Sequence, residues 1–118
     1  MNRTMEEQTT IRPVEKNNDG TPEEKPVISI LAPVYNEEPV LPELYRRVRE
    51  VMEQTGEPWE LVLVDDGSRD RSAEVIAALH EQDPRVRGLS FSRNFGFQIA
   101  VTAGLDYVEG DAVILADA

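Results

Sequence analysis

The sequence contains no cysteine, and no stretch of it approaches the run of about 20 apolar residues that a transmembrane helix needs. The missing cysteines exclude disulfides and thiolate zinc sites, and they are typical of a protein from a reducing compartment. There is only one histidine, which argues against a zinc site built from imidazoles. We therefore expect this segment itself to be soluble and cytoplasmic.

Basic residues are also scarce. The chain has 12 Lys and Arg residues against 23 Asp and Glu residues, which gives a formal net charge of −11. This charge disfavours non-specific binding to nucleic acid, because the phosphate backbone repels it. It also disfavours direct electrostatic attachment to an anionic membrane surface. We therefore predict no nucleic-acid partner.

Glycine is absent between Val27 and Thr55, where the first turn from strand to helix is expected. A common dinucleotide-binding fold has G-x-G-x-x-G at this turn, so that backbone amides can approach a pyrophosphate. The turn here contains Glu37 and Glu38 instead, whose carboxylates would repel a pyrophosphate. These acidic side chains must face another group, such as a base edge, a ribose hydroxyl or a cation.

The first part of the chain, residues 1–26, contains three prolines and no apolar run. Such a segment buries too little apolar surface to offset the entropy lost on ordering, so we predict a disordered acidic and polar tail. It also lacks the apolar stretch of a secretory signal. The predicted folded domain is therefore residues 27–118.

From residue 27 onward, short apolar runs alternate with segments of helical periodicity. The pattern predicts strands at 27–32, 60–64, 86–92 and 112–116, and helices at 39–55, 71–82 and 97–107. The apolar face of the first helix is predicted to be Val40, Leu41, Leu44, Val48, Val51 and Met52. Strands that alternate with helices indicate right-handed crossovers and a mostly parallel sheet, so the domain is of the α/β class.

The first strand is followed by Pro33-Val34-Tyr35-Asn36-Glu37-Glu38. An acidic residue after a buried strand lies where an open α/β sheet places ligand chemistry. Here Tyr35 can lie against a base, and Glu37 can accept a hydrogen bond from an N–H or a hydroxyl. The alternative is a solvated loop in which Asn36 and Glu38 lead into the next helix.

The second strand is followed by Asp65-Asp66-Gly67-Ser68. An acidic residue at the end of a second strand commonly accepts hydrogen bonds from a nucleoside. We assign this role to Asp66 and interpret Asp65 as a helper or a turn former; Ser68 and Asp70 are interpreted as capping residues. Because Asp66 is expected to lie outside the core, replacing it by Ala should weaken nucleotide binding and leave the fold intact.

We call the loop that follows the carboxyl end of a strand its exit. The third exit, Arg93-Asn94-Phe95-Gly96, suits an anionic ligand through Arg93 and the N-terminus of the following helix. Alternatively, Asn94 and Gly96 form a turn and Arg93 is solvated or paired with an acidic side chain. The fourth predicted strand is read as buried and is followed by Asp117. With a second Asp two positions later it would form D-x-D, whose carboxylates can hold Mg²⁺ or Mn²⁺ against a diphosphate.

These motifs resemble family 2 glycosyltransferases with the A-type nucleotide-diphospho-sugar fold. The resemblance rests on Ser29–Glu38 and Leu63–Asp70, and it covers about residues 27–118. The segments Ser92–Gly96, Thr102–Asp106 and Gly110-Asp111 are similar to the polyprenyl-phosphate sugar transferases, such as dolichyl-phosphate mannosyltransferase and bactoprenol glucosyltransferase.

The resemblance implies a three-layer, Rossmann-like nucleotide-diphospho-sugar transferase fold with a mostly parallel sheet. Residues 27–118 would be its N-terminal nucleotide-sugar-binding part, with the fold incomplete at the C-terminus. The second Asp of a D-A-D motif, the acceptor region and the C-terminal membrane helices would follow Ala118.

Carried over to matching positions, the resemblance implies a nucleotide-sugar site made of Pro33, Tyr35, Glu37, Val64, Asp66, Arg93, Gly96, Asp117 and Ala118. Asp117 would be the catalytic residue and a ligand of Mg²⁺ or Mn²⁺. The donor would be a UDP- or GDP-sugar, and the acceptor a polyprenyl phosphate of the undecaprenyl or dolichyl type. The intact protein would act at the cytoplasmic face of a membrane, and this segment alone is expected to be inactive.

Three other interpretations remain. One is a family 2 transferase that builds a polysaccharide or modifies a soluble acceptor, which would share the same donor half. Another is a non-catalytic nucleotide-binding module. The third is an unrelated α/β domain whose acidic strand exits are solvated.

Overall fold

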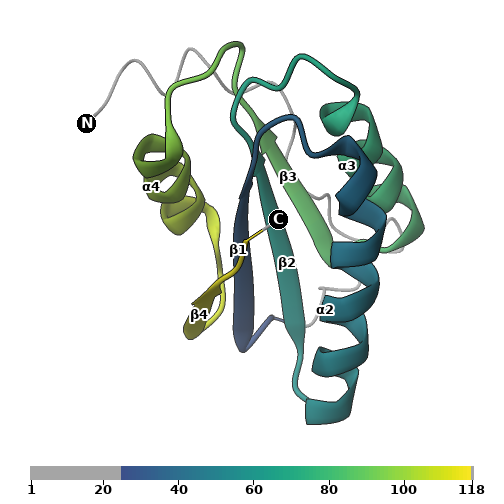
Figure 1. The fold of residues 1–118 in the computed structure, drawn as a ribbon. Helices are drawn as coiled ribbons and strands as arrows, with labels where there is room; N and C mark the ends of the chain where they lie inside the picture. Colours follow the sequence, from purple (N-terminus) through teal and green to yellow (C-terminus); the bar gives the residue numbers. More distant parts are fainter. Residues whose placement is uncertain (1–24, 118) are drawn as a thin grey trace, which may run out of the picture.

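The computed structural model describes residues 25–117, which form alternating strands and helices (Figure 1). The elements are β1 (Ile28–Val34), the 3₁₀ turn η1 (Glu38–Val40), α2 (Leu41–Thr55), β2 (Trp59–Asp65), α3 (Ser72–Gln82), β3 (Val86–Ser90), α4 (Phe97–Tyr107) and β4 (Ala112–Leu115). The predicted order of strands and helices is confirmed. The predicted tail, residues 1–26, lies almost wholly outside the described residues.

The four strands form one parallel sheet in the order β3-β2-β1-β4. Helices α2 and α3 cover one face of the sheet and α4 covers the other, which gives three layers (Figure 1). The three-layer α/β architecture with a parallel sheet is therefore confirmed. Because every strand runs in the same direction, all four strand exits lie at one edge of the sheet.

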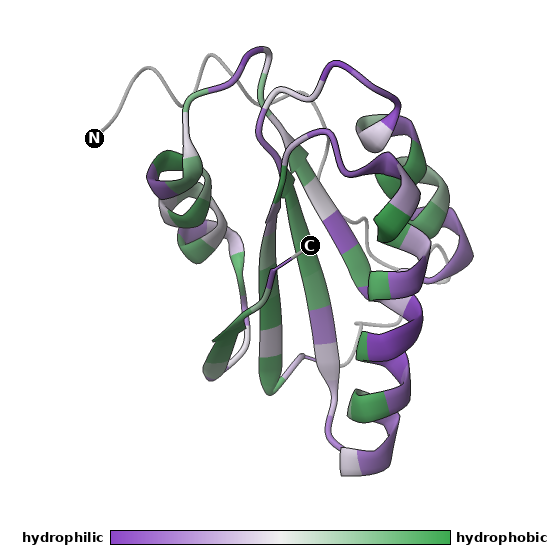
Figure 2. Ribbon diagram, in the orientation of Figure 1, coloured by the Kyte–Doolittle hydropathy of each residue, from purple (hydrophilic) through white to green (hydrophobic). Residues whose placement is uncertain are grey.

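Strand β2 lies at the centre of the core, and all seven of its residues are buried. A strand covered on both faces has a nearly continuous apolar sequence, as Leu61–Val64 has here. Figure 2 shows the same contrast, with apolar colour along the strands and polar colour on the outer side of α2. The loop that follows β2 is therefore attached to a completely buried strand.

The apolar face of α2 differs from the prediction. Tyr45 is buried in the core, where its hydroxyl donates to the Asp83 carboxylate at 2.7 Å, whereas Val40 and Val51 are exposed. The sequence pattern assigned only aliphatic residues to this face and therefore missed an aromatic ring with a buried hydrogen-bond partner. The helix ends as predicted at Gly56, whose φ of +75° suits a glycine.

Strand β4 is exposed, although its apolar sequence predicts a buried strand. It pairs with β1 alone, and Val113, Ile114 and Leu115 are each at least 40% exposed. The reason is its position: within residues 25–117 it is an edge strand with a neighbour on one side only. No helix in that same range has the length and apolar character needed to cross a bilayer.

Candidate functional site

Three of the four strand exits are level with one another. Val34 at the end of β1 is in register with Asp65 at the end of β2, and Asp65 is in register with Ser90 at the end of β3. The amide of Ala116 donates to the carbonyl oxygen of Leu31 at 2.8 Å, so the fourth exit leaves the same edge slightly earlier along β1. The loops that carry Glu37, Asp66 and Asp117 therefore share one edge of the sheet.

Asp66 is the central residue of this edge and is only 4% exposed. One carboxylate oxygen, Oδ1, accepts a hydrogen bond from the amide of Phe95 at 2.8 Å. The other, Oδ2, accepts hydrogen bonds at 3.0 Å from the amide of Gly96 and from Asn94 Nδ2. The expectation that Asp66 lies outside the core is wrong, because its carboxylate joins the second exit to the third.

The pKa of Asp66 is raised above 3.8, chiefly because burial disfavours the charged form. The amides of Phe95 and Gly96 act in the opposite direction, since they stabilise the carboxylate. The neighbouring charge of Asp65 raises the pKa further. The hydrogen bonds of the third loop offset part of the cost of burying this carboxylate.

Asp65 is a turn former, which is one of its two predicted roles. Its carboxylate accepts hydrogen bonds from the Ser68 amide at 3.1 Å and from the Ser90 hydroxyl at 3.0 Å. Asp65 is buried, and both of these hydrogen-bond donors belong to the protein itself. It therefore fixes the turn after β2 and links that turn to the end of β3.

Gly67 allows the second and third exits to approach each other closely. Its φ is +73°, and a Cβ atom at this position would overlap the backbone of Arg93 and Asn94. No side chain larger than hydrogen fits between the two loops. The sequence indicated a turn at Gly67, but it gave no sign of the segment that packs against it.

The first exit presents Tyr35 to solvent, with 42% of its surface exposed, followed by the half-buried Glu37. Pro33 is in register with Val64, and the pair lies on the face of the sheet that α4 covers. Pro33 is half-buried, whereas Val64 is completely buried. Of these four predicted nucleoside contacts, Tyr35 is exposed, Glu37 and Pro33 are half-buried, and Val64 is buried.

The first and second exits are joined by reciprocal hydrogen bonds between backbone amides and side chains. Asn36 N donates to Ser68 Oγ at 2.8 Å, Glu37 N to Ser72 Oγ at 3.0 Å, and Glu38 N to Asp70 Oδ2 at 3.2 Å. In return, Arg69 N donates to Asn36 Oδ1 at 2.8 Å, and Arg71 N to Glu38 Oε1 at 3.1 Å. We call this set of hydrogen bonds the loop clamp. Because the clamp occupies these amides, they are not available to a phosphate.

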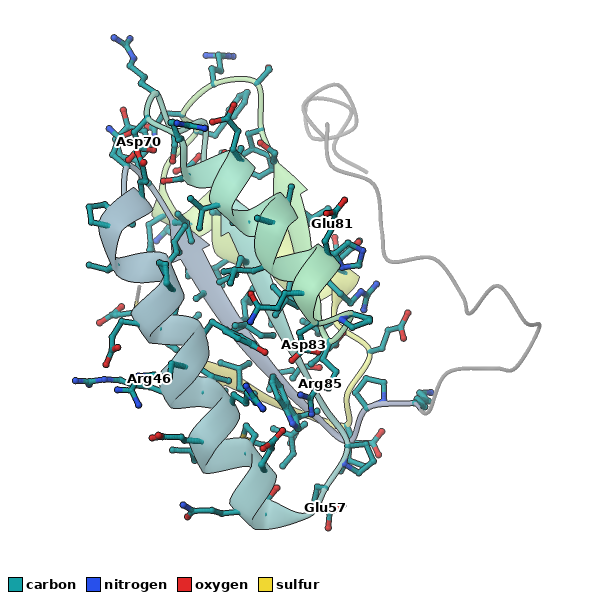
Figure 3. All side chains as sticks on the ribbon, turned by 90° about the vertical axis from the view of Figure 1, so that its right-hand side faces the viewer. Arg46, Glu57, Asp70, Glu81, Asp83 and Arg85 are labelled. Atoms are coloured by element: carbon teal, nitrogen blue, oxygen red, sulfur yellow. The ribbon has the colours of Figure 1, made fainter. Side chains whose placement is uncertain are left out.

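Asp70 caps the start of α3 as predicted, because its Oδ1 accepts a hydrogen bond from the Ser72 amide at 2.9 Å, whereas Ser68 Oγ accepts from Asn36 of the first loop. Figure 3 shows Asp70 at the end of the molecule where α2 and α3 begin, opposite the end that carries Glu57. The Ser72 hydroxyl is the main cause that lowers the pKa of Asp70 below 3.8. Sequence reasoning did not predict the bridging roles of Asn36 and Ser72, which depend on contacts more than 30 residues apart.

The third exit brings a cation to the edge of the sheet. Arg93 is exposed, and its guanidinium carbon lies 4.2 Å from the centre of the Phe95 ring. Stacking on an aromatic face holds a guanidinium while leaving its N–H donors accessible. Gly96 follows with a φ of +107° and leads into α4. The bend of this loop lies at residues 92–93, just before the turn expected at Asn94 and Gly96.

Asp117 is exposed, and Ala118 lies outside the described residues. Within residues 25–117, no three His, Cys, Asp or Glu side chains are grouped as a metal site. Mg²⁺ is usually held by one or two carboxylates together with substrate phosphate oxygens, so a single exposed carboxylate fits part of such a donor set. The remaining protein ligands would have to come from elsewhere.

Comparison with known proteins identifies the family. The sequence profile described as Glycosyl transferase family 2 matches residues 29–118. The chain belongs to glycosyl transferase family 2. The resemblance of its strand-exit motifs to this family is therefore confirmed.

Two curated relatives show how far the similarity extends. The chain is 56% identical over 90 residues to "Uncharacterized glycosyltransferase YkcC" of Bacillus subtilis (strain 168), covering 76% of this chain and 28% of that protein. It is 49% identical over 92 residues to the undecaprenyl-phosphate 4-deoxy-4-formamido-L-arabinose transferase of Shewanella sediminis (strain HAW-EB3), covering 77% and 28%. The chain thus spans less than a third of the length of these relatives.

A solved structure supports the fold. The mannosyltransferase PcManGT from Pyrobaculum calidifontis, in complex with GDP-Man and Mn²⁺, superposes with a TM-score of 0.66 at 21% sequence identity. The match covers 98% of this chain and 32% of that chain. At this level of identity the likeness extends to the fold alone.

Proposed function

We propose that residues 27–118 form the donor-binding part of a glycosyltransferase that moves a sugar from a UDP- or GDP-sugar to a polyprenyl phosphate. The observation that carries the proposal is the convergence of four strand exits of a family 2 chain on one edge of the sheet. The acceptor class is inferred from the relatives named as undecaprenyl-phosphate transferases. Such an acceptor would place the reaction at the cytoplasmic face of a membrane.

Each accessible side chain has a role in this proposal. Tyr35 lies against the base, and Glu37 accepts a hydrogen bond from the base or the ribose. Arg93 offers N–H donors to the anionic part of the donor. Pro33, Val64, Asp66 and Gly96 form the buried or half-buried floor that holds the three loops in place.

The diphosphate needs positive charge, and the loop clamp leaves it no amides from residues 36–38, 69 or 71. We propose that Asp117 is a ligand of Mg²⁺ or Mn²⁺ and that Ala118 lies beside the same diphosphate. The bound cation would supply the charge that balances the leaving nucleoside diphosphate. Asp117 is exposed at the correct edge of the sheet for this role.

The reaction is a displacement at the anomeric carbon. An oxygen of the lipid phosphate forms the new bond to that carbon, and the bond to the nucleoside diphosphate breaks. The attacking phosphate oxygen is already ionised at neutral pH, so the step needs no strong general base. The one histidine of the described residues, His80, lies near the end of α3 and not at the strand exits, which agrees with such a step.

The test uses the full-length protein that contains this chain. Calorimetry with UDP and GDP, each with and without Mn²⁺, should reveal metal-dependent binding of at least one nucleotide. Radiolabelled sugar should then pass from the matching nucleotide-sugar to a polyprenyl phosphate. Transfer only to a soluble acceptor or a polysaccharide would overturn the acceptor assignment, and absence of nucleotide binding would overturn the whole proposal.

A further inference from the structure

We propose that Asn36 and Ser68 are positioning residues that set the directions of Tyr35 and Glu37 in the nucleotide site. The inference rests on the proposed function and extends it to residues that do not themselves contact the donor. The resemblance to the family gave neither residue a part in the site. Its basis is the loop clamp between the first and second strand exits.

Asn36 lies between the two accessible nucleoside contacts and is held from both ends. Its amide donates to Ser68 Oγ at 2.8 Å, and its side-chain oxygen Oδ1 accepts from the amide of Arg69 at 2.8 Å. The amide of Asp70 approaches the same oxygen at 3.4 Å. A residue with a fixed backbone amide and a fixed side chain cannot rotate, so its neighbours Tyr35 and Glu37 take fixed directions.

The backbone of Asn36 has an uncommon conformation. Its φ is +53°, and it is the one non-glycine residue with positive φ in the part of the chain that the structure describes. Asparagine tolerates this left-handed region better than most residues, because its short polar side chain can hydrogen-bond locally. The turn directs the chain from β1 into η1 within three residues of the end of the strand.

The side chain of Tyr35 is not held by contacts of its own, so its direction depends on the clamp. Its side chain is exposed, and no hydrogen bond or ring contact to it is found among the described residues. An aromatic ring on an exposed loop keeps its direction only if the backbone beneath it is held. Pre-organisation of this kind strengthens binding because the loop does not have to be ordered when the ligand arrives.

The Asn36–Ser68 part of the clamp lies at the surface, which separates its effect on binding from its effect on stability. Asn36 is exposed and Ser68 is half-buried, so solvent can replace the lost hydrogen bonds in a variant. The ligand-free protein should therefore melt at nearly the same temperature after a substitution here. The loop, however, would sample several conformations, and only some of them would bind the nucleoside.

The experiment compares S68A, S68T and N36G in the full-length protein. S68A removes the hydroxyl that accepts from Asn36, whereas S68T keeps it; N36G keeps the left-handed backbone and removes the side-chain acceptor. The probe is UDP or GDP with Mn²⁺, whichever the unsubstituted protein binds. We expect S68A and N36G to weaken binding about tenfold and S68T to stay within about twofold.

Two further readouts distinguish positioning from general weakening. S68A and N36G should raise the donor KM and leave kcat nearly unchanged, because binding and not chemistry depends on the loop. T55A serves as the control, since Thr55 Oγ1 also joins side chain to backbone in a turn, at Met52 O and Glu57 N, but at the far end of α2. T55A should leave the nucleotide affinity unchanged.

The outcomes separate this inference from the proposed function. If the unsubstituted protein binds neither nucleotide, the proposed function fails, and the inference fails with it. If it binds and both S68A and N36G keep its affinity, only the positioning role is overturned. Equal loss of affinity in T55A, or unfolding of S68A and N36G at the assay temperature, would assign the clamp to folding and would also overturn it.

Discussion

The Asp66 carboxylate accepts a hydrogen bond from the amide of Gly96 at 3.0 Å, which ties the end of the second strand to the start of the third helix. The same carboxylate holds Asn94 and Phe95, so three consecutive residues of the third exit depend on one buried charge. The loop that carries Arg93 is therefore positioned from the second strand. An acidic residue that the sequence predicts to contact a ligand thus organises the loop beside it.

The burial of Asp66 predicts an effect of pH on stability. Because its pKa is raised in the folded protein, the folded state keeps this proton at pH values where the unfolded chain has already lost it. The contribution of Asp66 is thus fully present below its ordinary pKa of 3.8 and is lost as pH rises through the folded pKa. In D66N the group cannot titrate, so the variant lacks this component.

Urea unfolding from about pH 3 to about pH 7 measures this pH-dependent contribution of Asp66 to stability. D66N will differ from the unsubstituted chain by an offset that does not depend on pH, since its amide makes different hydrogen bonds. The informative quantity is the slope of the difference: the unsubstituted chain should lose stability relative to D66N as pH rises through the window above 3.8. A slope of the opposite sign would show that the three hydrogen bonds outweigh burial.

The close approach of the second and third exits predicts that replacing Gly67 is more destabilising than replacing a glycine with free space around it. G67A and G56A make a matched pair, because both glycines have φ near +75° but only at Gly67 would an added Cβ meet backbone atoms. The left-handed conformation should cost each variant about 1–2 kcal/mol. Overlap with Arg93 and Asn94 should add about 1–3 kcal/mol in G67A. Equal losses of stability in chemical unfolding would disprove the close approach.

The sequence predicted the arrangement of strands, helices and exits because these follow from local periodicity and from turn residues. Alternation of apolar runs with helical segments was sufficient to predict the parallel sheet, and the acidic exits Glu37, Asp66 and Asp117 do share one edge. The exposure of β4 was missed, since an apolar run does not reveal how many neighbours a strand has. Strand order is a property of the whole chain.

The burial of Asp66 and the loop clamp were missed for a related reason. Asp66 meets Phe95 and Gly96 across about thirty residues of sequence, and Asn36 meets Arg69 across a similar distance. Nothing near either residue in the chain indicates its partner. The polar motifs therefore predicted which loops share one edge of the sheet, but not which of their side chains contact each other.

A buried ion pair at the amino end of the sheet predicts a strong coupling between two strands. Arg87 of β3 donates to the Glu60 carboxylate of β2, and both side chains are almost completely buried. The Glu60 carboxylate also accepts from the amide of Glu109 at 2.7 Å, which fixes the turn between α4 and β4. Removing the arginine alone leaves an uncompensated carboxylate in the interior, so R87M should lose about 3–5 kcal/mol.

The double variant E60Q/R87M tests this explanation. Glutamine removes the charge and keeps an oxygen that can accept from the Glu109 amide, so the double variant should be more stable than R87M alone. Thermal unfolding of R87M, E60Q and the double variant compares their losses of stability. If the two losses simply add, the pair is not coupled, and the cost of R87M arises from lost packing against Tyr107, over whose ring the guanidinium lies at 4.4 Å.

The position of Asp117 predicts which of the two acidic residues flanking β4 controls metal-dependent binding. Asp111 and Asp117 are both exposed and lie on either side of β4, Asp111 before its amino end and Asp117 after its carboxyl end. D111N and D117N therefore change the net charge equally, and they differ in the edge of the sheet that they alter. If the metal lies at the strand exits, D117N in the full-length protein should weaken Mn²⁺-dependent binding of UDP or GDP by about tenfold or more, and D111N should not.

Calorimetric titrations of nucleotide at fixed Mn²⁺ measure the affinities of both variants. Equal affinities in the two variants would remove Asp117 from the metal site, whereas a loss in D111N alone would place the cation at the wrong edge for the proposed donor.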